Sequence, residues 1–253
     1  MSCAPVGRPE GPADHGILDS TPLHDLHEWF RRDVEGRLAE TVGGPARLRV
    51  IALLACVLGL NAADVATVGA VATQLESSLS IGNTQIGLLV TVSTGIGALA
   101  ALPAGALTDR VRRTTLLSVS ILLWCAAMVA SALSVSYLVL LLTRLALGAV
   151  VAVAGPAVAS LTGDFFPVAD RGRVYGFILT GELLGAAFGV LVSGNVAGAL
   201  SWRASFVVLA VPGIALAAAV WRLLPEPARG GQSRLEEGAE EIASAEDVAE
   251  EEA

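Results

Sequence analysis

Three ionisable side chains lie inside long apolar stretches of this 253-residue chain: Asp64, Arg144 and Glu182. A charge in hydrocarbon costs at least ~2.5 kcal/mol, so each of these side chains is expected to face a cavity or to pair with another charge. In that setting a carboxylate or a guanidinium can bind a charged solute, and a carboxylate can carry a proton. The apolar stretches contain no His, and the chain has neither an HExxH nor a GxxxxGK sequence. We therefore expect no enzyme, no cofactor and no metal site.

Composition points to the membrane. Hydrophobic residues make up 54% of the chain, charged residues only 16%, and the mean hydropathy is +0.67. These values are too apolar for a soluble domain of this size. The net charge of −8 arises largely from nine acidic residues between Glu236 and Glu252, and nothing indicates nucleic-acid binding. We expect an all-α membrane protein in which abundant small residues let helices approach closely.

Six apolar runs predict six membrane-spanning helices, since about 20 residues are needed to cross a bilayer. Gly155-Pro156 predicts a kink in the fourth helix. Gly181, Gly185 and Gly189 recur at four-residue spacing and predict a smooth face on the fifth. The expected spans are 48–72, 84–107, 115–134, 137–163, 173–197 and 204–224.

Arginine placement predicts the orientation. One side of the predicted bundle carries clusters of Arg before the first helix, between helices two and three, between four and five, and after six, whereas the other side has only Arg203. Positive loops stay in the cytoplasm, so we expect both termini there, in a plasma (inner) membrane protein. The clustered residues are Arg31, Arg32, Arg37, Arg47, Arg49, Arg110, Arg112, Arg113, Arg171, Arg173, Arg222, Arg229 and Arg234.

Depth decides which membrane charges can meet. Asp64 and Arg144 both fall roughly 10–12 Å below the outer surface, at ~1.5 Å per residue. They can therefore form an ion pair across a cavity, either lining a substrate path with an acid that carries a proton or fixing helix packing alone. Glu182 belongs to the inner half. It either joins the path or reaches a neighbouring hydroxyl or the cytoplasmic vestibule.

The chain divides into three expected parts. Residues 1–46 form a cytoplasmic extension that contains either an amphipathic surface helix or no regular structure. No apolar segment follows Met1, so a cleaved signal peptide is not expected. Residues 47–225 form the six-helix domain, and 226–253 form an acidic cytoplasmic tail or linker.

Two short, similar segments predict an internal repeat. Gly105-Ala-Leu-Thr-Asp-Arg110 follows the second predicted helix, and Gly198-Ala-Leu-Ser-Trp-Arg203 follows the fifth, on the opposite side. This is the pattern of two three-helix units with inverted topology.

These residues resemble the major facilitator superfamily. Gly105-x-x-x-Asp109-Arg110-x-x-Arg113 is similar to its signature loop between helices two and three, and Arg144-x-x-x-Gly148 to a second motif in helix four. Four further segments resemble the spinster-like and organic-anion branches: Leu60-Asn61-x-x-Asp64, Asp170-Arg171-Gly172-Arg173, Trp202-Arg203 and Leu224-Pro225-Glu226-Pro227.

The resemblance implies secondary transport by alternating access, with helices one and four lining the cavity. Asn61, Asp64, Arg144 and Glu182 would then form the substrate or proton pathway. A cytoplasmic charge cluster would latch the outward-open state, and its residues would be Gly105, Asp109, Arg110, Arg113 and Asp164. This sequence departs from the motif at Arg112, where the family has Gly, and at Thr114, where it has a basic residue.

The family has twelve helices and this sequence predicts six, so we expect half of a major facilitator fold. It would move a small organic solute, anionic or lipid-like, with coupling to protons. It would need a homodimer partner, a separate second half, or the rest of a longer protein. The alternative is a non-transporting membrane scaffold or regulator that binds another membrane protein.

Overall fold

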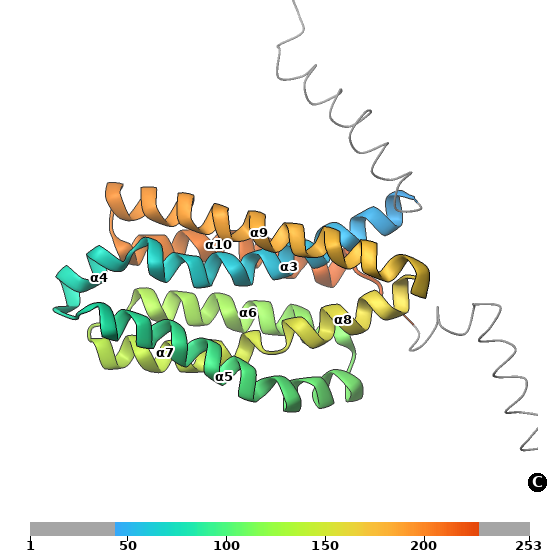
Figure 1. Ribbon diagram of the computed structural model, residues 1–253, viewed down its shortest axis with the longest axis horizontal. Helices are drawn as coiled ribbons and strands as arrows, with labels where there is room; N and C mark the ends of the chain where they lie inside the picture. The colour runs from blue at the N-terminus through green and yellow to red at the C-terminus, as the bar shows by residue number, and fades with distance from the viewer. Residues whose placement is uncertain (1–43, 228–253) are drawn as a thin grey trace, which may run out of the picture. The chain divides into compact units, whose positions relative to one another are not determined.

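The computed structural model describes residues 44–227, which form helices joined by short turns and contain no strand (Figure 1). The extension before residue 44 and the acidic tail from 228 onward lie outside the described residues. Six helical spans between these limits are long and apolar enough to cross a membrane, as expected. The helices are α3 (Pro45–Ala70), α4 (Ala72–Leu79), α5 (Asn83–Arg110), α6 (Arg113–Ala132), α7 (Tyr137–Val151), α8 (Ala154–Phe165), α9 (Val168–Ala199) and α10 (Trp202–Leu223).

The helix ends differ from the expected ones mainly at polar turns. α5 continues to Arg110, so the signature loop is mostly helical and the turn itself is Val111 and Arg112. α9 begins at Val168 rather than at 173, with Asp170 in its first turn. A carboxylate there is stabilised by the positive end of the helix dipole, so this polar turn extends the helix beyond the apolar run.

The fourth span is broken. α7 ends at Val151 and α8 begins at Ala154, which gives the kink that Gly155-Pro156 predicted. Pro156 has no N–H to donate to the carbonyl of Ala152, four residues earlier, and its ring crowds that carbonyl. The chain therefore loosens at Ala152 and Val153 before it resumes as α8.

The fifth helix packs against the first through its glycines. A Cβ on Gly59 of α3 would come within 2.8 Å of the carbonyl oxygen of Gly181. A Cβ on Gly185 would overlap the backbone of Gly59, and one on Gly189 would overlap the backbone of Ala63. The predicted smooth face of α9 is thus real, and α3 is the helix that lies on it.

Two other contacts complete a symmetric pattern. A Cβ on Gly148 of α7 would overlap the backbone of Ser93 in α5, so the fourth and second spans touch closely. The ring of Trp124 in α6 lies against Gly213 of α10, which joins the third span to the sixth. The pairs of spans in close contact are one–five, two–four and three–six. When spans one, two and three are exchanged with four, five and six, the first two pairs swap and the third maps onto itself, so the set of contacts is the same. Equivalent spans are three crossings apart, and because three is odd they cross the membrane in opposite directions, so the two units are inverted, as the repeat predicts.

Candidate functional site: a buried ion pair and a charge cluster

The ion pair between Asp64 and Arg144 lies inside the helix bundle. Nη1 of Arg144, from α7, donates to Oδ1 of Asp64, from α3, at 2.7 Å. Each residue is only 1% exposed. Removing either partner would leave the other charge buried and uncompensated. The two residues that the sequence places at one depth therefore meet between the first and fourth spans.

Two further helices hold the guanidinium. Nη2 of Arg144 donates to the sulfur of Met128 in α6 at 3.5 Å, and the Phe206 ring of α10 lies 4.7 Å from the guanidinium carbon. The Nε–H is buried without a hydrogen-bond partner in the described part of the chain. Three bundle helices thus fix this cation, yet one of its buried donors is left unsatisfied within the described residues.

A small cavity adjoins the pair. Its volume is about 10 Å³, near the minimum that holds one water molecule. Asp64, Val65 and Val68 of α3 line it, together with Leu89, Val90 and Ser93 of α5 and Arg144 of α7. The cavity therefore has room for water or a proton, but none for an organic solute.

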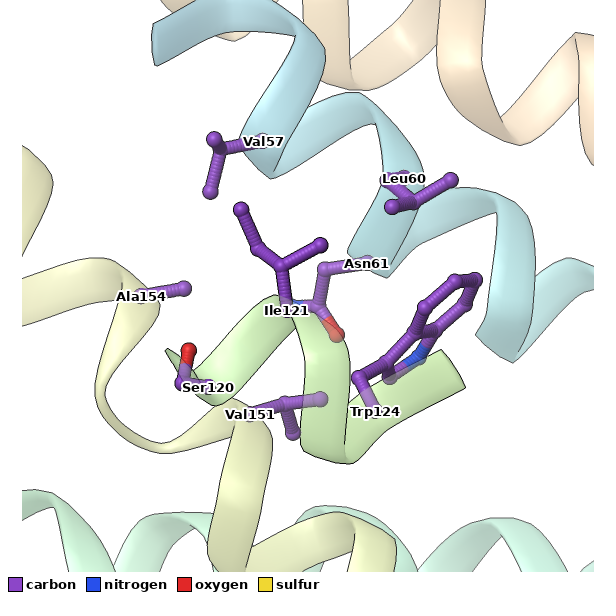
Figure 2. Close-up of a pocket in the computed structure, with 8 residues that line it drawn as sticks. All are labelled: Val57, Leu60, Asn61, Ser120, Ile121, Trp124, Val151 and Ala154. Atoms are coloured by element: carbon purple, nitrogen blue, oxygen red, sulfur yellow. The ribbon is translucent and has the colours of Figure 1, made fainter. Parts of the chain in front are cut away.

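A second pocket lies beside Asn61 and the break in the fourth span (Figure 2). Trp124, 3% exposed, contributes an indole N–H that has no partner among the described residues. The cavity volume is about 20 Å³, which suits a single water molecule. It is lined by Val57, Leu60, Asn61, Ser120, Ile121, Trp124, Val151 and Ala154.

Asn61 and Asp64 connect the two pockets. They lie three positions apart on α3, so their side chains share one helix face about one turn apart. That face meets α6 and the α7–α8 break at Asn61, and α5 and α7 at Asp64. Polar groups therefore follow α3 through an otherwise apolar interior.

Glu182 lies apart from these groups. It is half-buried on α9 and forms no hydrogen bond or ion pair with another described residue. Its neighbour Gly181 packs against Ala55, more than two helical turns from Asp64 along α3. The structure thus does not bring Glu182 to Asp64 or Arg144.

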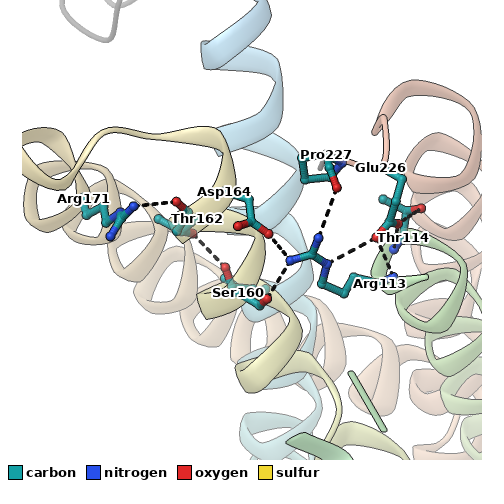
Figure 3. A network of polar contacts seen from close by, with 10 residues as sticks. Arg113, Thr114, Ser160, Thr162, Asp164, Arg171, Glu226 and Pro227 are labelled. Atoms are coloured by element: carbon teal, nitrogen blue, oxygen red, sulfur yellow. Dashed lines mark hydrogen bonds and ion pairs between the residues drawn. The ribbon is translucent and has the colours of Figure 1, made fainter. Parts of the chain in front are cut away.

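A separate charge cluster surrounds Arg113 at the start of α6 (Figure 3). The Arg113 side chain is 3% exposed and pairs with Asp164 of α8 and with Glu226, where Nε and Oε1 are 3.2 Å apart. Nη1 also donates to the Ser160 hydroxyl at 2.8 Å, and Nη2 to the Pro227 carbonyl at 3.2 Å. One guanidinium therefore links α6, α8 and the segment after α10.

Glu226 is a member of this cluster, although the sequence pointed to it only within a segment that resembles the family. Its carboxylate accepts the backbone N–H groups of Arg113 and Thr114 at 2.9 and 2.8 Å, and the Thr114 hydroxyl at 2.6 Å. Burial raises the pKa of this carboxyl, but the bonds from Thr114 and Arg113 outweigh it and hold the pKa below the ordinary 4.5. The signal was an acidic residue between Pro225 and Pro227, directly after the last span.

The other expected latch residues lie outside the cluster. Asp109 and Arg110 are exposed on the last turn of α5 and form no ion pair with described residues. A Cβ at Gly105 would meet nothing within 4 Å, so neither residue packing nor backbone conformation in this chain requires glycine there. These three residues present a free surface beside the cluster.

Known membrane proteins share the sequence pattern and the fold of this chain. The sequence pattern of the Major Facilitator Superfamily matches residues 54–249. A bacterial homologue of the human lysosomal transporter Spinster, solved inward-facing and occupied, matches with a TM-score of 0.71 and 26% identity, over 74% of this chain and 46% of that one. The inward-open xylose transporter XylE of E. coli matches with a TM-score of 0.62 and 17% identity, over 77% and 50%.

The chain thus spans half or less of the length of these solved structures. The spinster homologue agrees with the resemblance seen in the sequence, whereas the likeness to XylE concerns the fold. Six apolar spans, the inverted three-helix units and the match over most of the sequence lead to one assignment. This integral membrane chain belongs to the major facilitator superfamily, as a six-helix unit with spinster-like relatives.

Proposed function

We propose that this chain is half of a secondary transporter that moves a small organic solute by alternating access. The observation that carries the proposal is the buried pair of Asp64 and Arg144 between the first and fourth spans. Charges at that depth are costly, and where they occur they mark solute or ion pathways or fix helix packing. The buried N–H groups of Arg144 Nε and Trp124, which have no partner among the described residues, favour the path.

A second half is needed to make room for the solute. The two cavities beside Asp64 and Asn61 measure about 10 and 20 Å³, enough only for water. Organic ligands occupy cavities of about 300–1,000 Å³. The solute site is therefore assigned to the surface between this unit and a second one, which is another copy, a separate chain or a further part of the same protein.

The proposed solute carries a hydrogen-bond acceptor, and an anionic or lipid-like one fits the donors best. Once a conformational change opens the bundle to the solute, protonation of Asp64 would release the Arg144 guanidinium to bind an anion, and deprotonation would restore the pair. We propose that this competition couples transport to protons. The protein is proposed to lie in the plasma membrane. Arginine placement predicts that both termini are in the cytoplasm.

The cluster of Arg113, Asp164 and Glu226 is proposed as the cytoplasmic latch. It joins three elements by bonds whose energy depends on their present arrangement. Asp109, Arg110 and Gly105 lie on the neighbouring turn, where a second half could meet them. Glu182, half-buried on α9, remains a proposed member of the inner pathway.

Transport into proteoliposomes tests the proposal. The protein is reconstituted with and without crosslinking, and uptake of labelled organic anions and a fluorescent lysophospholipid is followed under a proton gradient. Asp64→Asn and Arg144→Ala should abolish uptake, whereas Glu76→Gln, at the edge of the bundle, should retain it. Uptake that survives both pathway substitutions would refute the pathway. A strictly monomeric chain without uptake, copurifying with another membrane protein, would favour the scaffold alternative.

A further inference from the structure

A third cavity lies at the ends of three spans, away from the ion pair and the latch. Its volume is about 250 Å³, at least ten times that of either interior pocket. The first turns of α3, the end of α8 and the end of α10 surround it. Its lining residues are Ala46, Arg47, Arg49, Val50, Phe165, Phe166, Leu223 and Pro225.

The cavity combines two cations with an apolar floor. Val50 and Phe166 are 7% and 1% exposed and form the inner wall. Arg49 is exposed and has no ion pair with a described residue. Arg47 reaches Asp170 at 3.9 Å, with both side chains partly exposed, which is a weak contact in water. Both guanidinium groups can therefore turn to an incoming anion.

This chemistry matches one occupant. Guanidinium groups bind phosphate through paired hydrogen bonds, so Arg47 and Arg49 suit a phosphate diester. A free phosphate ion would gain nothing from the Phe165, Phe166 and Leu223 side chains, whereas the glycerol and first acyl carbons of a lipid would bury them. We propose that this cavity binds the headgroup of an anionic phospholipid.

The position of the cavity supports the same occupant. It opens at helix ends, where a span leaves the hydrocarbon and headgroups lie. Arginine placement assigns this end to the cytoplasm, the side on which anionic lipids attract basic residues. The proposal is independent of transport, because none of its residues belongs to the Asp64 pathway or to the Arg113 cluster.

Native mass spectrometry of the full chain tests the site. The protein is exchanged from detergent into mixtures of phosphatidylglycerol and phosphatidylcholine, and retained lipids are counted. We expect one phosphatidylglycerol to remain at detergent levels that remove phosphatidylcholine. Arg47→Gln with Arg49→Gln should weaken its retention by about 25-fold, since each basic residue near a membrane surface contributes about fivefold.

A charge-matched double variant is the control. Arg173→Gln with Arg222→Gln removes two exposed arginines from the same side and should keep the bound lipid. Equal loss of phosphatidylglycerol from both double variants would overturn the site, because retention would then depend only on the net charge of the protein. Equal retention of phosphatidylcholine, or displacement by millimolar inorganic phosphate, would also overturn it. Circular dichroism checks that each variant keeps its helices.

Discussion

Glu226 lies 113 residues after Arg113, yet its carboxylate accepts the backbone N–H of Arg113 at 2.9 Å and the side-chain Nε–H at 3.2 Å. It also accepts the backbone N–H of Thr114 at 2.8 Å. The first N–H groups of a helix have no partner within the helix. Glu226 therefore caps α6 from outside and ties the exit of the last span to the start of the third.

Glu226→Ala should destabilise the bundle by about 1–3 kcal/mol, since it removes a cap and leaves Arg113 without one of its carboxylates. Glu226→Gln should cost less, because the amide oxygen can still accept one backbone N–H. Thermal unfolding in detergent, followed by circular dichroism, measures the effect. Glu76→Gln, half-buried on α4, is the control. Equal unfolding temperatures for Glu226→Ala and the parent would show that the cap contributes nothing to the stability of the fold.

The cap should also depend on pH in a defined direction. The folded pKa of Glu226 lies below its ordinary 4.5, so the folded state binds the proton less well than the unfolded state does. The stabilisation is then fully present above 4.5 and is lost as the pH falls through the lower folded pKa. The difference in unfolding temperature between the parent and Glu226→Gln should shrink as the pH is lowered from 7 toward 3. A difference in unfolding temperature that stayed constant over that range would contradict the lowered pKa of Glu226.

The pair of Asp64 and Arg144 should show strong non-additivity. Asp64→Asn or Arg144→Ala alone should cost about 3–5 kcal/mol, because each leaves a buried charge without its partner. The double variant should cost less than the sum of the two. Unfolding of the four proteins in a double-mutant cycle measures the interaction energy. A sum that matches the double variant would mean that the 2.7 Å contact contributes nothing.

The glycine contact between α3 and α9 gives a packing prediction. Gly185→Ala should destabilise the bundle by about 1–3 kcal/mol or more, since its Cβ would overlap the Gly59 backbone. Gly194→Ala is the matched control on the same helix, because its Cβ would meet nothing within 4 Å. Alanine there should be neutral or slightly stabilising through its higher helix propensity. Similar unfolding temperatures for both variants would disprove the close approach.

Hydropathy was sufficient to predict six spans, because the bilayer imposes a length and a polarity on each helix. Counting rise per residue likewise placed Asp64 and Arg144 at one depth. Such counting could not find the partner of Arg113, since Glu226 reaches it only through the packing of α6 against α10. It also could not show that Asp109 points away, because that depends on how far α5 continues beyond its apolar run.

The break at Ala152 and Val153 has a mechanical consequence. Arg144 and Asp164 belong to one membrane crossing but to two separate helices, α7 and α8. The joint between them lies beside the cavity lined by Asn61 and Trp124. A bend at this joint would move α8 together with the charge cluster, while α7 stayed held by the pair of Asp64 and Arg144.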